Sequence, residues 1–170
     1  MVLCILQDYR VPDYTLQLKK ETMKRLVVYR GLPGSGKSTS AKKLQESLIK
    51  QGETVAYYEA DMYWIGEDGQ YHFDPKRLGD AHAWCRNKVR EALRNCTTVI
   101  VANTNLTKKE MDLWQQIAMS ENAKMEAFHM KTMFGNIHGV PEETLEKMKA
   151  KETDWPGEIT ITAIQRDKNA

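Results

Sequence analysis

The chain has 170 residues, enough for one domain with a substantial hydrophobic core and too few for two large domains. Its 25 basic and 23 acidic residues leave a formal charge of +2, so it lacks the strong overall positive charge of many nucleic-acid-binding proteins. Three cysteines without metal-binding spacing are typical of reduced thiols, so a cytoplasmic location is expected. No apolar run is long enough to cross a bilayer, so we expect no membrane association.

Basic residues are concentrated near the start of the chain. The first 50 residues hold ten Lys or Arg and four Asp or Glu, which predicts a modestly positive surface in that half. Residues 1–22 show no clear periodicity and are interpreted as an N-terminal extension of unassigned role. Residues 23–170 are expected to form the single domain.

The first predicted elements alternate between strand and helix. An apolar run at residues 26–29 predicts a buried strand, and the helix that follows is expected to end at Gly52. Residues 55–58 predict a second strand. After a hairpin turn at residues 68–69, Asp74 and Pro75 are expected to begin a long helix, as N-cap and first-turn residue.

The same alternation continues to the end of the chain. Residues 98–102 predict a third strand, Thr107 is expected to cap the next helix, and residues 124–131 alternate as a strand does. Pro141 is expected to begin a further helix, and residues 159–164 predict a last strand. This order predicts an α/β fold of three layers, with a mainly parallel sheet of about five strands and right-handed crossovers.

The segment Gly31–Ser38 reads GLPGSGKS, a complete G-x-x-x-x-G-K-[ST] phosphate-binding motif between a predicted strand and a predicted helix. Its glycines let backbone N–H groups face phosphate oxygens, and the helix N-terminus adds its dipole. Lys37 is expected to reach the terminal phosphates and the Ser38 hydroxyl to bind Mg²⁺, so ATP and Mg²⁺ are the predicted cofactors. The residues expected to bind the nucleotide are Gly31, Gly34, Ser35, Gly36, Lys37, Ser38 and Thr39.

Other features favour a phosphotransferase among the P-loop classes. The third strand ends at Asn103, without the carboxylate that organises Mg²⁺ in motor and switch ATPases, and the guanine-reading motif N-K-x-D is absent. Asp61 follows the second strand, at the edge where open parallel sheets bind ligands. We expect Asp61 to act as general base on an acceptor hydroxyl, alongside Lys37 as the other catalytic residue. A plain strand-end cap is the alternative role for Asp61.

Aromatic residues cluster around the predicted hairpin at Tyr63, Trp64, Tyr71 and Phe73. They form either a small core that stabilises the loop or a platform on which a base of the acceptor stacks. On the following helix His82 is expected to be a hydrogen-bonded core histidine rather than a catalytic one. The residues expected to line the acceptor site are Asp61, Tyr63, Trp64, Asn103 and Asn105.

Five segments occur in an order that resembles a known family. They are GLPGSGKSTSAKKL, EADMYW, YHFDPKRLGDAHAWC, VIVANTNLTKKEMDLW and HGVPEETLEKMK. Over roughly residues 24–152 the chain resembles the small P-loop kinases related to phage polynucleotide 5′-kinase. The resemblance implies phosphoryl transfer from ATP to the 5′-hydroxyl of a polynucleotide or nucleotide. It also implies that Lys37 and Ser38 hold the donor phosphates and that Asp61 is the general base.

The chain departs from this family's pattern at three positions. Trp64 stands where the family has an arginine that reads the 3′-phosphate of the acceptor, and Asn103 replaces an aspartate. Gly135 stands where relatives often carry a lid arginine, for which the candidate substitutes are Lys131, His138 and Arg166. Two alternative functions therefore stay open. One is a kinase for a nucleoside, drug or metabolite, and the other is a nucleotide-dependent binding module without phosphotransfer.

Overall fold

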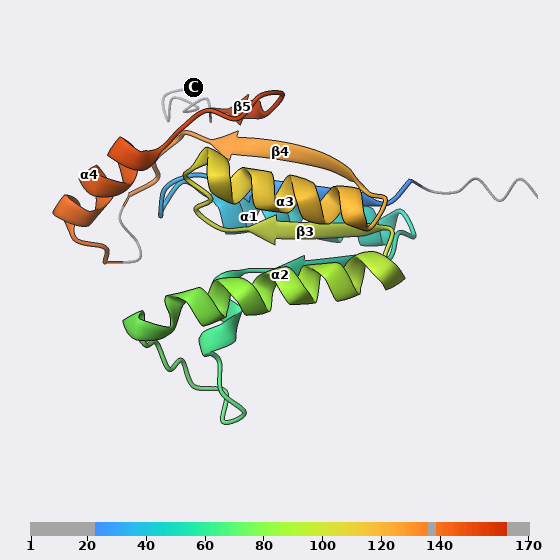
Figure 1. The fold of residues 1–170 in the computed structure, drawn as a ribbon, viewed down its shortest axis with the longest axis horizontal. Coiled ribbons are helices and arrows are strands. Elements are labelled where there is room, and N and C mark those ends of the chain that lie inside the picture. The colour runs from blue at the N-terminus through green and yellow to red at the C-terminus, as the bar shows by residue number, and fades with distance from the viewer. Residues whose placement is uncertain (1–22, 136–138, 163–170) are drawn as a thin grey trace, which may run out of the picture.

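The computed structural model describes residues 23–135 and 139–162. Five strands form one sheet in the order β2-β3-β1-β4-β5, and every neighbouring pair is parallel (Figure 1). This confirms the predicted parallel sheet. The strands are β1 (Arg25–Arg30), β2 (Val55–Tyr58), β3 (Thr98–Ala102), β4 (Lys124–Met130) and β5 (Ile159–Ile161).

Helices cover both faces of the sheet and make the predicted three layers. In Figure 1, α2 and α3 lie in front of the sheet and α1 lies behind it. Helix α4 lies beyond the carboxyl end of β4. The helices are α1 (Lys37–Lys50), α2 (Leu78–Asn95), α3 (Lys108–Ser120) and α4 (Glu142–Lys151), with short 3₁₀ helices η2 (Ala60–Trp64) and η3 (Pro75–Arg77).

The central strands β1 and β3 are buried on both faces, which explains their continuous apolar runs in the sequence. In β3 every residue is buried, and in β1 all but the first, because helices cover both faces of these strands. One core lies under α2 and α3 and includes Trp64, Cys85 and Trp114, and a second core lies under α1 and includes Val27 and Leu48.

The predicted helix boundaries follow local chemistry. Thr107 caps α3 as predicted and forms a capping box with Glu110. Asp74 accepts a hydrogen bond from the Lys76 backbone N–H and so caps the short η3, whereas α2 begins only at Leu78, later than predicted. An isolated antiparallel bridge between Ile65 and Tyr71 closes the predicted hairpin turn.

The last strand is shorter than predicted: β5 ends at Ile161, and residues 163–164 of the prediction lie outside the described residues, as does the predicted extension at 1–22. Within the described ranges, no helix combines the length and apolar character that a membrane crossing needs.

Parallel pairing brings the carboxyl ends of all strands to one edge of the sheet. The phosphate loop follows β1, Asp61 follows β2, and Asn103 and Asn105 follow β3. Open parallel sheets bind their ligands at this edge, so the fold collects the predicted site residues in one region.

Candidate active site

The phosphate loop needs glycine at two positions for steric reasons. Gly34 and Gly36 have φ values of 80° and 84°, in the left-handed region. A Cβ atom on Gly34 would lie 2.2 Å from the carbonyl oxygen of Gly135, and one on Gly36 would lie 3.0 Å from the ring of Phe134. The loop passes directly into α1 at Lys37, so its end is a helix N-terminus with free N–H groups and a favourable dipole for phosphate.

Two buried side chains in the loop carry polar groups for which a phosphate group would supply partners. Lys37 is 9% exposed, and its Nζ donates to the carbonyl oxygen of Leu32 at 2.9 Å. Burial lowers the pKa of Lys37 to about 8, although Glu59 and Asp61 act in the opposite direction. Ser35 is fully buried, and its Oγ has no hydrogen-bond partner in the described part of the chain. A buried ammonium and an unpaired hydroxyl both gain from phosphate oxygens.

Two carboxylates, rather than the one predicted, follow β2. Asp61 is exposed in the first turn of η2, as expected for a group that meets an acceptor. Glu59, which the sequence analysis did not single out, comes directly before η2, and its Oε1 is buried without a partner among the described residues. Both carboxylates raise the pKa of Lys37, and Glu59 has the larger effect. The available signal was the acid-x-acid spacing at the end of a strand.

The residues around the loop fit Mg²⁺. Ser38 supplies a hydroxyl in the first turn of α1. Glu59 and Asp61 supply carboxylates, and neither forms an ion pair with another side chain in residues 23–135 or 139–162. Mg²⁺ prefers hard oxygen ligands and retains several waters, which suits one hydroxyl and carboxylates at the edge of the site.

Asn103 forms hydrogen bonds inside the protein at both ends of its amide. It is 7% exposed, its Oδ1 accepts a hydrogen bond from the Ala60 backbone N–H at 2.8 Å, and its Nδ2 donates to Cys85 Sγ at 3.6 Å. Both ends of the amide are therefore occupied inside the protein. Asn103 thus joins the end of β3 to the start of η2, next to Asp61, and its contact with an acceptor stays a prediction.

Asn105 is also buried but keeps a free donor. Its Oδ1 accepts a hydrogen bond from Trp114 Nε1 at 2.9 Å, whereas its Nδ2 has no partner among the described residues. The backbone has a φ of 43°, a left-handed conformation that asparagine tolerates. Asn105 therefore keeps an unpaired donor, and its place in the acceptor site stays a prediction.

The prediction that Trp64 offers a stacking face is wrong. Trp64 is 3% exposed and packs edge-on against Tyr63 and Phe73, at ring-centroid distances of 5.0 Å and 5.2 Å. The neighbouring Tyr63 is half-buried, and its hydroxyl accepts a hydrogen bond from Arg77, whose guanidinium also lies over the ring. The small-core interpretation therefore holds for both residues, because they fill the space between η2 and α2.

The aromatic face that solvent can reach lies elsewhere in the same hairpin. Tyr71 and Phe73 are 58% and 51% exposed, and their rings are stacked with an interplanar angle of 5°. Burial and the nearby negative charge of Asp61 raise the pKa of Tyr71. This electrostatic effect indicates that Tyr71 lies near Asp61, the predicted general base.

The first part of the predicted lid contacts the phosphate loop. The Phe134 backbone N–H donates to the carbonyl oxygen of Gly34 at 2.9 Å. Of the candidate arginine substitutes, Lys131 forms an ion pair with Asp154 at 3.5 Å, while His138 and Arg166 lie outside the described residues. Gly135 has a φ of 113°, so an arginine at this position would be strained.

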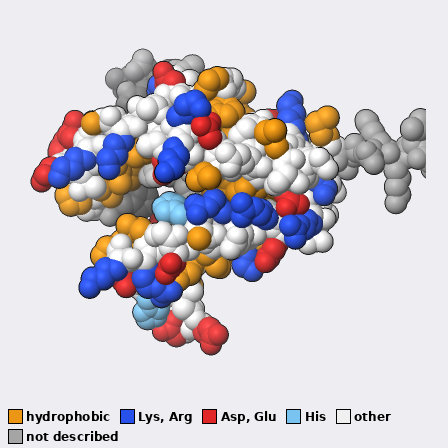
Figure 2. Space-filling view, in the orientation of Figure 1, with side chains coloured by type: hydrophobic (Ala, Val, Ile, Leu, Met, Phe, Trp, Pro, Cys, Tyr) orange, Lys and Arg blue, Asp and Glu red, His pale blue; other side chains and the backbone are white. Residues whose placement is uncertain are grey.

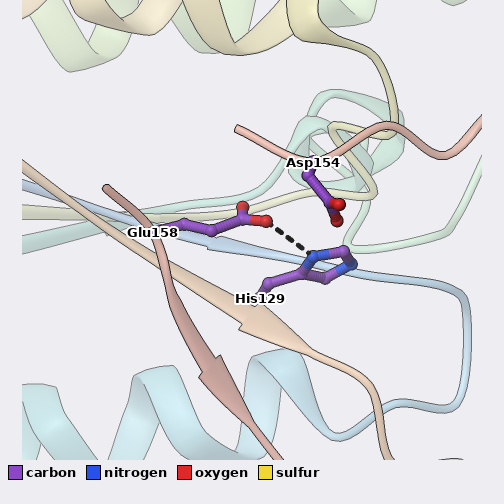
Figure 3. A group of neighbouring side chains, drawn as sticks. All are labelled: His129, Asp154 and Glu158. Carbon is purple, nitrogen blue, oxygen red and sulfur yellow. Dashed lines mark hydrogen bonds and ion pairs between the residues drawn. The ribbon is translucent and has the colours of Figure 1, made fainter. Parts of the chain in front are cut away.

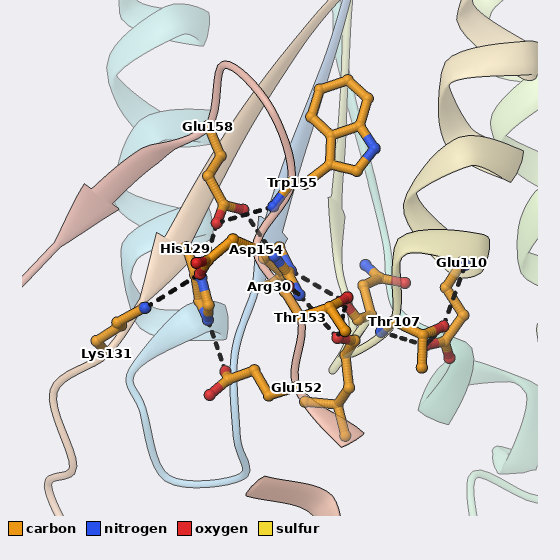
Figure 4. A network of polar contacts seen from close by, with 12 residues as sticks. Arg30, Thr107, Glu110, His129, Lys131, Glu152, Thr153, Asp154, Trp155 and Glu158 are labelled. Carbon is orange, nitrogen blue, oxygen red and sulfur yellow. Dashed lines mark hydrogen bonds and ion pairs between the residues drawn. The ribbon is translucent and has the colours of Figure 1, made fainter. Parts of the chain in front are cut away.

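Directly before the loop, the buried Arg30 joins four segments of the chain (Figure 4). Its Nη1 pairs with Glu158 at 2.7 Å, and its Nε donates to the carbonyl oxygen of Asn105 at 2.9 Å. Its Nη2 donates to the carbonyl oxygens of Leu106 and Thr153, at 2.9 Å and 2.6 Å. Arg30 therefore fixes the turn after β3, on which the amide of Asn105 depends.

His129 extends this network and raises the possibility of a metal site. Ligand atoms of His129, Asp154 and Glu158 lie within 4.8 Å of one another (Figure 3). However, His129 Nδ1 already lies 3.0 Å from Glu158, and its Nε2 lies 2.6 Å from Glu152. A cation here would compete with the guanidinium of Arg30 for Glu158, so the cluster is a structural network rather than a metal centre.

Solved structures share this fold at low sequence identity. APS kinase CysC of Mycobacterium tuberculosis, in complex with AMPPNP and APS, has a TM-score of 0.58 and 15% identity, covering 81% of this chain and 88% of that chain. Kti12 of Chaetomium thermophilum, in complex with ADP-AlF3, has a TM-score of 0.58 and 14% identity, covering 80% and 88%. A chain of the Pnkp1/Rnl/Hen1 complex has a TM-score of 0.51 and 20% identity, covering 87% and 43%. The chain thus has a P-loop kinase-like fold.

Two curated relatives match by sequence. Human NEDD4-binding protein 2 is 38% identical over 135 residues, which are 72% of this chain and 7% of that protein, so the chain spans only a small part of it. Uncharacterized protein PM0531 of Pasteurella multocida is 28% identical over 153 residues, which are 84% of this chain and 86% of that protein.

A sequence model of a protein family matches most of this chain and identifies its family. The resemblance to phage polynucleotide kinases is supported at the level of the P-loop kinase-like fold, which also occurs in several other kinases. The model that matches residues 24–160, well over half of the sequence, is that of the family described as Chromatin associated protein KTI12. The chain therefore belongs to the KTI12 family.

Proposed function

We propose that the chain is an ATP- and Mg²⁺-dependent phosphotransferase that acts on the 5′-hydroxyl of a polynucleotide or nucleotide. The observation that carries this proposal is the proximity of donor and acceptor groups. Glu59 and Asp61 are close enough to Lys37 to change its pKa, and Asp61 is exposed with no ion-pair partner in the described part of the chain. A protein that only binds a nucleotide needs no base on the acceptor side.

Each group then has a defined task. The backbone N–H groups of the loop, the Ser35 hydroxyl and Lys37 bind the phosphates of ATP. Ser38 and the carboxylates after β2 would hold Mg²⁺, which would supply positive charge at the transferring phosphate. Asp61 accepts the proton of the acceptor hydroxyl, and Asn103 holds Asp61 in place through the Ala60 backbone.

Two features support a nucleic acid or nucleotide as acceptor. The exposed, stacked rings of Tyr71 and Phe73 lie on the hairpin that follows Asp61, and aromatic faces of this kind bind unstacked bases. One structural neighbour belongs to a complex described as an RNA repair complex, which agrees with this acceptor class.

One observation favours a second candidate, a nucleotide-dependent binding module without phosphotransfer. The segment that rests on the phosphate loop holds Phe134 and Gly135, with no arginine to grip the transferring phosphate. An arginine in that role is worth about 10³–10⁵ in rate, so its loss would favour binding over turnover.

A transfer assay distinguishes these functions. The full chain is incubated with [γ-³²P]ATP, Mg²⁺ and 5′-OH RNA, 5′-OH DNA, nucleosides, nucleoside monophosphates or gluconate. Labelling of the 5′-OH strands or of the nucleotides, lost in Lys37→Ala, is the expected result. Labelling of nucleosides or gluconate alone would instead identify a small-molecule kinase.

Thermal unfolding with and without ATP·Mg²⁺ serves as the parallel measurement. A stabilisation that Lys37→Ala removes, without any labelled acceptor, would identify the binding module. The absence of both ATP-dependent stabilisation and acceptor labelling would contradict both functions.

A further inference from the structure

A pocket of about 210 Å³ lies between α2 and α3, next to the edge of the sheet that carries the active-site residues. Its walls include His82 and Arg86 of α2, Glu110 and Trp114 of α3, and Asn105 from the turn after β3. A water occupies about 30 Å³ in the liquid, so the pocket has room for several waters or for a phosphate group in their place. The proposed roles of Lys37 and Asp61 do not use this pocket.

The wall formed by Asn105 carries a buried donor without an acceptor. Asn105 is 4% exposed, and its Nδ2 has no hydrogen-bond partner in residues 23–135 or 139–162. Trp114 Nε1 can only donate, so it holds Oδ1 and leaves Nδ2 as the free end of the amide. Arg30 holds the backbone carbonyl of Asn105, and Trp114 holds the side-chain oxygen. Leaving such a donor unpaired is costly, and a ligand oxygen would satisfy it.

The wall formed by α2 carries uncompensated positive charge. Arg86 is half-buried and forms no hydrogen bond or ion pair with another residue in the described ranges. His82, which the sequence predicted to be a hydrogen-bonded core residue, is instead half-buried and also has no such partner there. Glu110 is the acid on the wall, and its Oε2 already accepts hydrogen bonds from the backbone and hydroxyl of Thr107, at 2.9 Å and 2.8 Å.

The positive charge continues along α2 beyond the pocket. His82, Arg86, Arg90 and Arg94 follow one another every four residues, which places them in one row on a helix. Figure 2 shows Lys and Arg side chains in such a row over α2, with a histidine at one end beside a hollow. Arg90 bonds the neutral amide of Asn87, while Arg94 pairs with Glu121. Free charge is therefore greatest at Arg86 and decreases toward the far end of the helix.

We propose that this pocket and the row on α2, together the α2 track, bind the phosphodiester backbone of a single-stranded nucleic acid acceptor. One backbone phosphate binds Arg86 and the Nδ2 of Asn105, and later phosphates follow Arg90 along the helix. The 5′ end then lies toward Asp61, with an unstacked base near Tyr71, because all these groups share one edge of the sheet. This assignment rests on the proposed function and names the substrate class of that site.

Strand binding without ATP tests the α2 track separately from catalysis. We would measure fluorescence anisotropy of a 3′-labelled 5′-OH RNA or DNA strand with the full chain, over a range of salt concentrations. Arg86→Gln should weaken binding about tenfold through loss of one charge-assisted hydrogen bond. It should also make the salt slope shallower by about 0.7, the value for one phosphate contact on a single strand.

The matched variants lie on the same helix. Arg90→Gln should have a smaller effect than Arg86→Gln, and Arg94→Gln a smaller one still, because Glu121 already compensates Arg94. Lys88→Gln, which removes a charge paired with Glu91 outside the row, is the control and should bind as the unmodified chain does.

A further variant tests the buried donor without removing its structural bond. Asn105→Asp keeps an oxygen for Trp114 Nε1 and replaces the free donor by an anionic oxygen, so it should bind strands at least as weakly as Arg86→Gln. Circular dichroism and the ATP-dependent thermal shift confirm that each variant is folded.

Each outcome decides the assignment. Unchanged affinity and salt slope in Arg86→Gln and Asn105→Asp, both folded, would overturn it. Competition by inorganic phosphate or by a mononucleotide as strong as that by a strand would also overturn it, because the site would then hold a small anion. If the unmodified chain binds strands through Arg86 but labels none with [γ-³²P]ATP, the proposed function fails while the α2 track stands. If Arg86→Gln labels strands with an unchanged acceptor KM, the proposed function stands while the α2 track fails.

Discussion

The phosphate loop and the acceptor side of this site are assembled from very different lengths of chain. The loop is one continuous stretch, Gly31–Ser38, and its glycines, lysine and serines act where the sequence places them. The acceptor side that we propose instead takes Asp61 from η2, Tyr71 from the hairpin, Arg86 from α2 and Asn105 from the turn after β3. Substitutions in the loop should therefore weaken ATP binding. Substitutions on the acceptor side should affect transfer or acceptor binding and leave ATP binding intact.

The sharpest separation should come from Asp61→Asn. It keeps the size of the side chain and removes the proton-accepting charge, so the transfer rate should fall about 10²–10⁴-fold. The ATP-dependent thermal shift should be nearly unchanged, because Lys37 and the loop remain. Glu67→Gln, an exposed acid in the neighbouring hairpin, is the control and should transfer phosphate normally. Normal turnover in Asp61→Asn would move the base elsewhere, with Glu59 as the next candidate.

Arg30 links the two regions, and its loss should affect stability strongly. Arg30→Met removes the guanidinium from the buried Glu158, which then keeps His129 beside it; breaking a buried ion pair typically costs about 3–5 kcal/mol. The control is Arg25→Met, whose pair with Glu53 is partly exposed and should contribute about 1 kcal/mol or less. Urea unfolding measures both. Equal midpoints for the two variants would show that the network around Arg30 adds no special stability.

The same network predicts a loss of stability in acid. Burial alone would raise the pKa of Glu158, but the hydrogen bonds from Arg30 and His129 outweigh it and lower the pKa. A carboxyl group with a lowered pKa in the folded state stabilises the fold above its unfolded pKa, and that contribution is lost as the pH falls through the folded pKa. The unmodified chain should therefore lose more stability below about pH 4 than Arg30→Met does, in urea unfolding at several pH values.

Two aromatic substitutions should affect different properties: one the stability of the fold and the other the acceptor KM. Trp64→Ala removes a buried ring and should cost about 3–5 kcal/mol of stability. Tyr71→Ala should change stability by about 0.5 kcal/mol or less because the ring is exposed. It should nevertheless raise the acceptor KM about fivefold to a hundredfold if a base stacks on it. An unchanged KM in Tyr71→Ala would exclude this ring from the acceptor site.

The last expected effect is a pH dependence of ATP affinity that arises from Lys37 in the loop. Without ATP the pKa of Lys37 is lowered to about 8, and bound phosphate would raise it again. ATP binding therefore favours the protonated lysine, and affinity should fall as the pH rises above 8, by at most about tenfold per pH unit. Lys37→Arg keeps its charge and should show a flat profile over the same range in a titration of ATP binding. A flat profile in the unmodified chain would contradict the lowered pKa.

Much of the fold could be predicted because its signals are local. The apolar runs of β1 and β3, the capping box at Thr107 and the turn after Ile65 each depend on residues close together in sequence. Strand–helix alternation then limits the chain to a parallel sheet with helices on both faces. The phosphate loop was predictable for the same reason, since its function depends on backbone conformation and a fixed spacing.

The acceptor side was predicted only in part, because the orientation of a side chain depends on distant neighbours. Sequence could not tell that Trp64 faces the core while Tyr71 faces solvent, since an aromatic ring suits either place. It did not single out Glu59, whose buried and unpaired oxygen becomes visible only in the folded structure. It gave Asn103 and Asn105 the same role, although the amide of Asn103 is hydrogen-bonded at both its oxygen and its nitrogen and that of Asn105 at its oxygen alone.

The sequence by itself therefore determined the class of fold and the donor half of the site, from residues adjacent in the chain. The tertiary structure alone decided which groups meet on the acceptor side. Parallel pairing brings the ends of β2 and β3 to one edge, and Arg30 fixes the turn that carries Asn105. Packing of α2 against α3 then places Arg86 beside that turn. These contacts join segments far apart in the chain, so they follow from packing and hydrogen bonding in the folded state rather than from any local pattern.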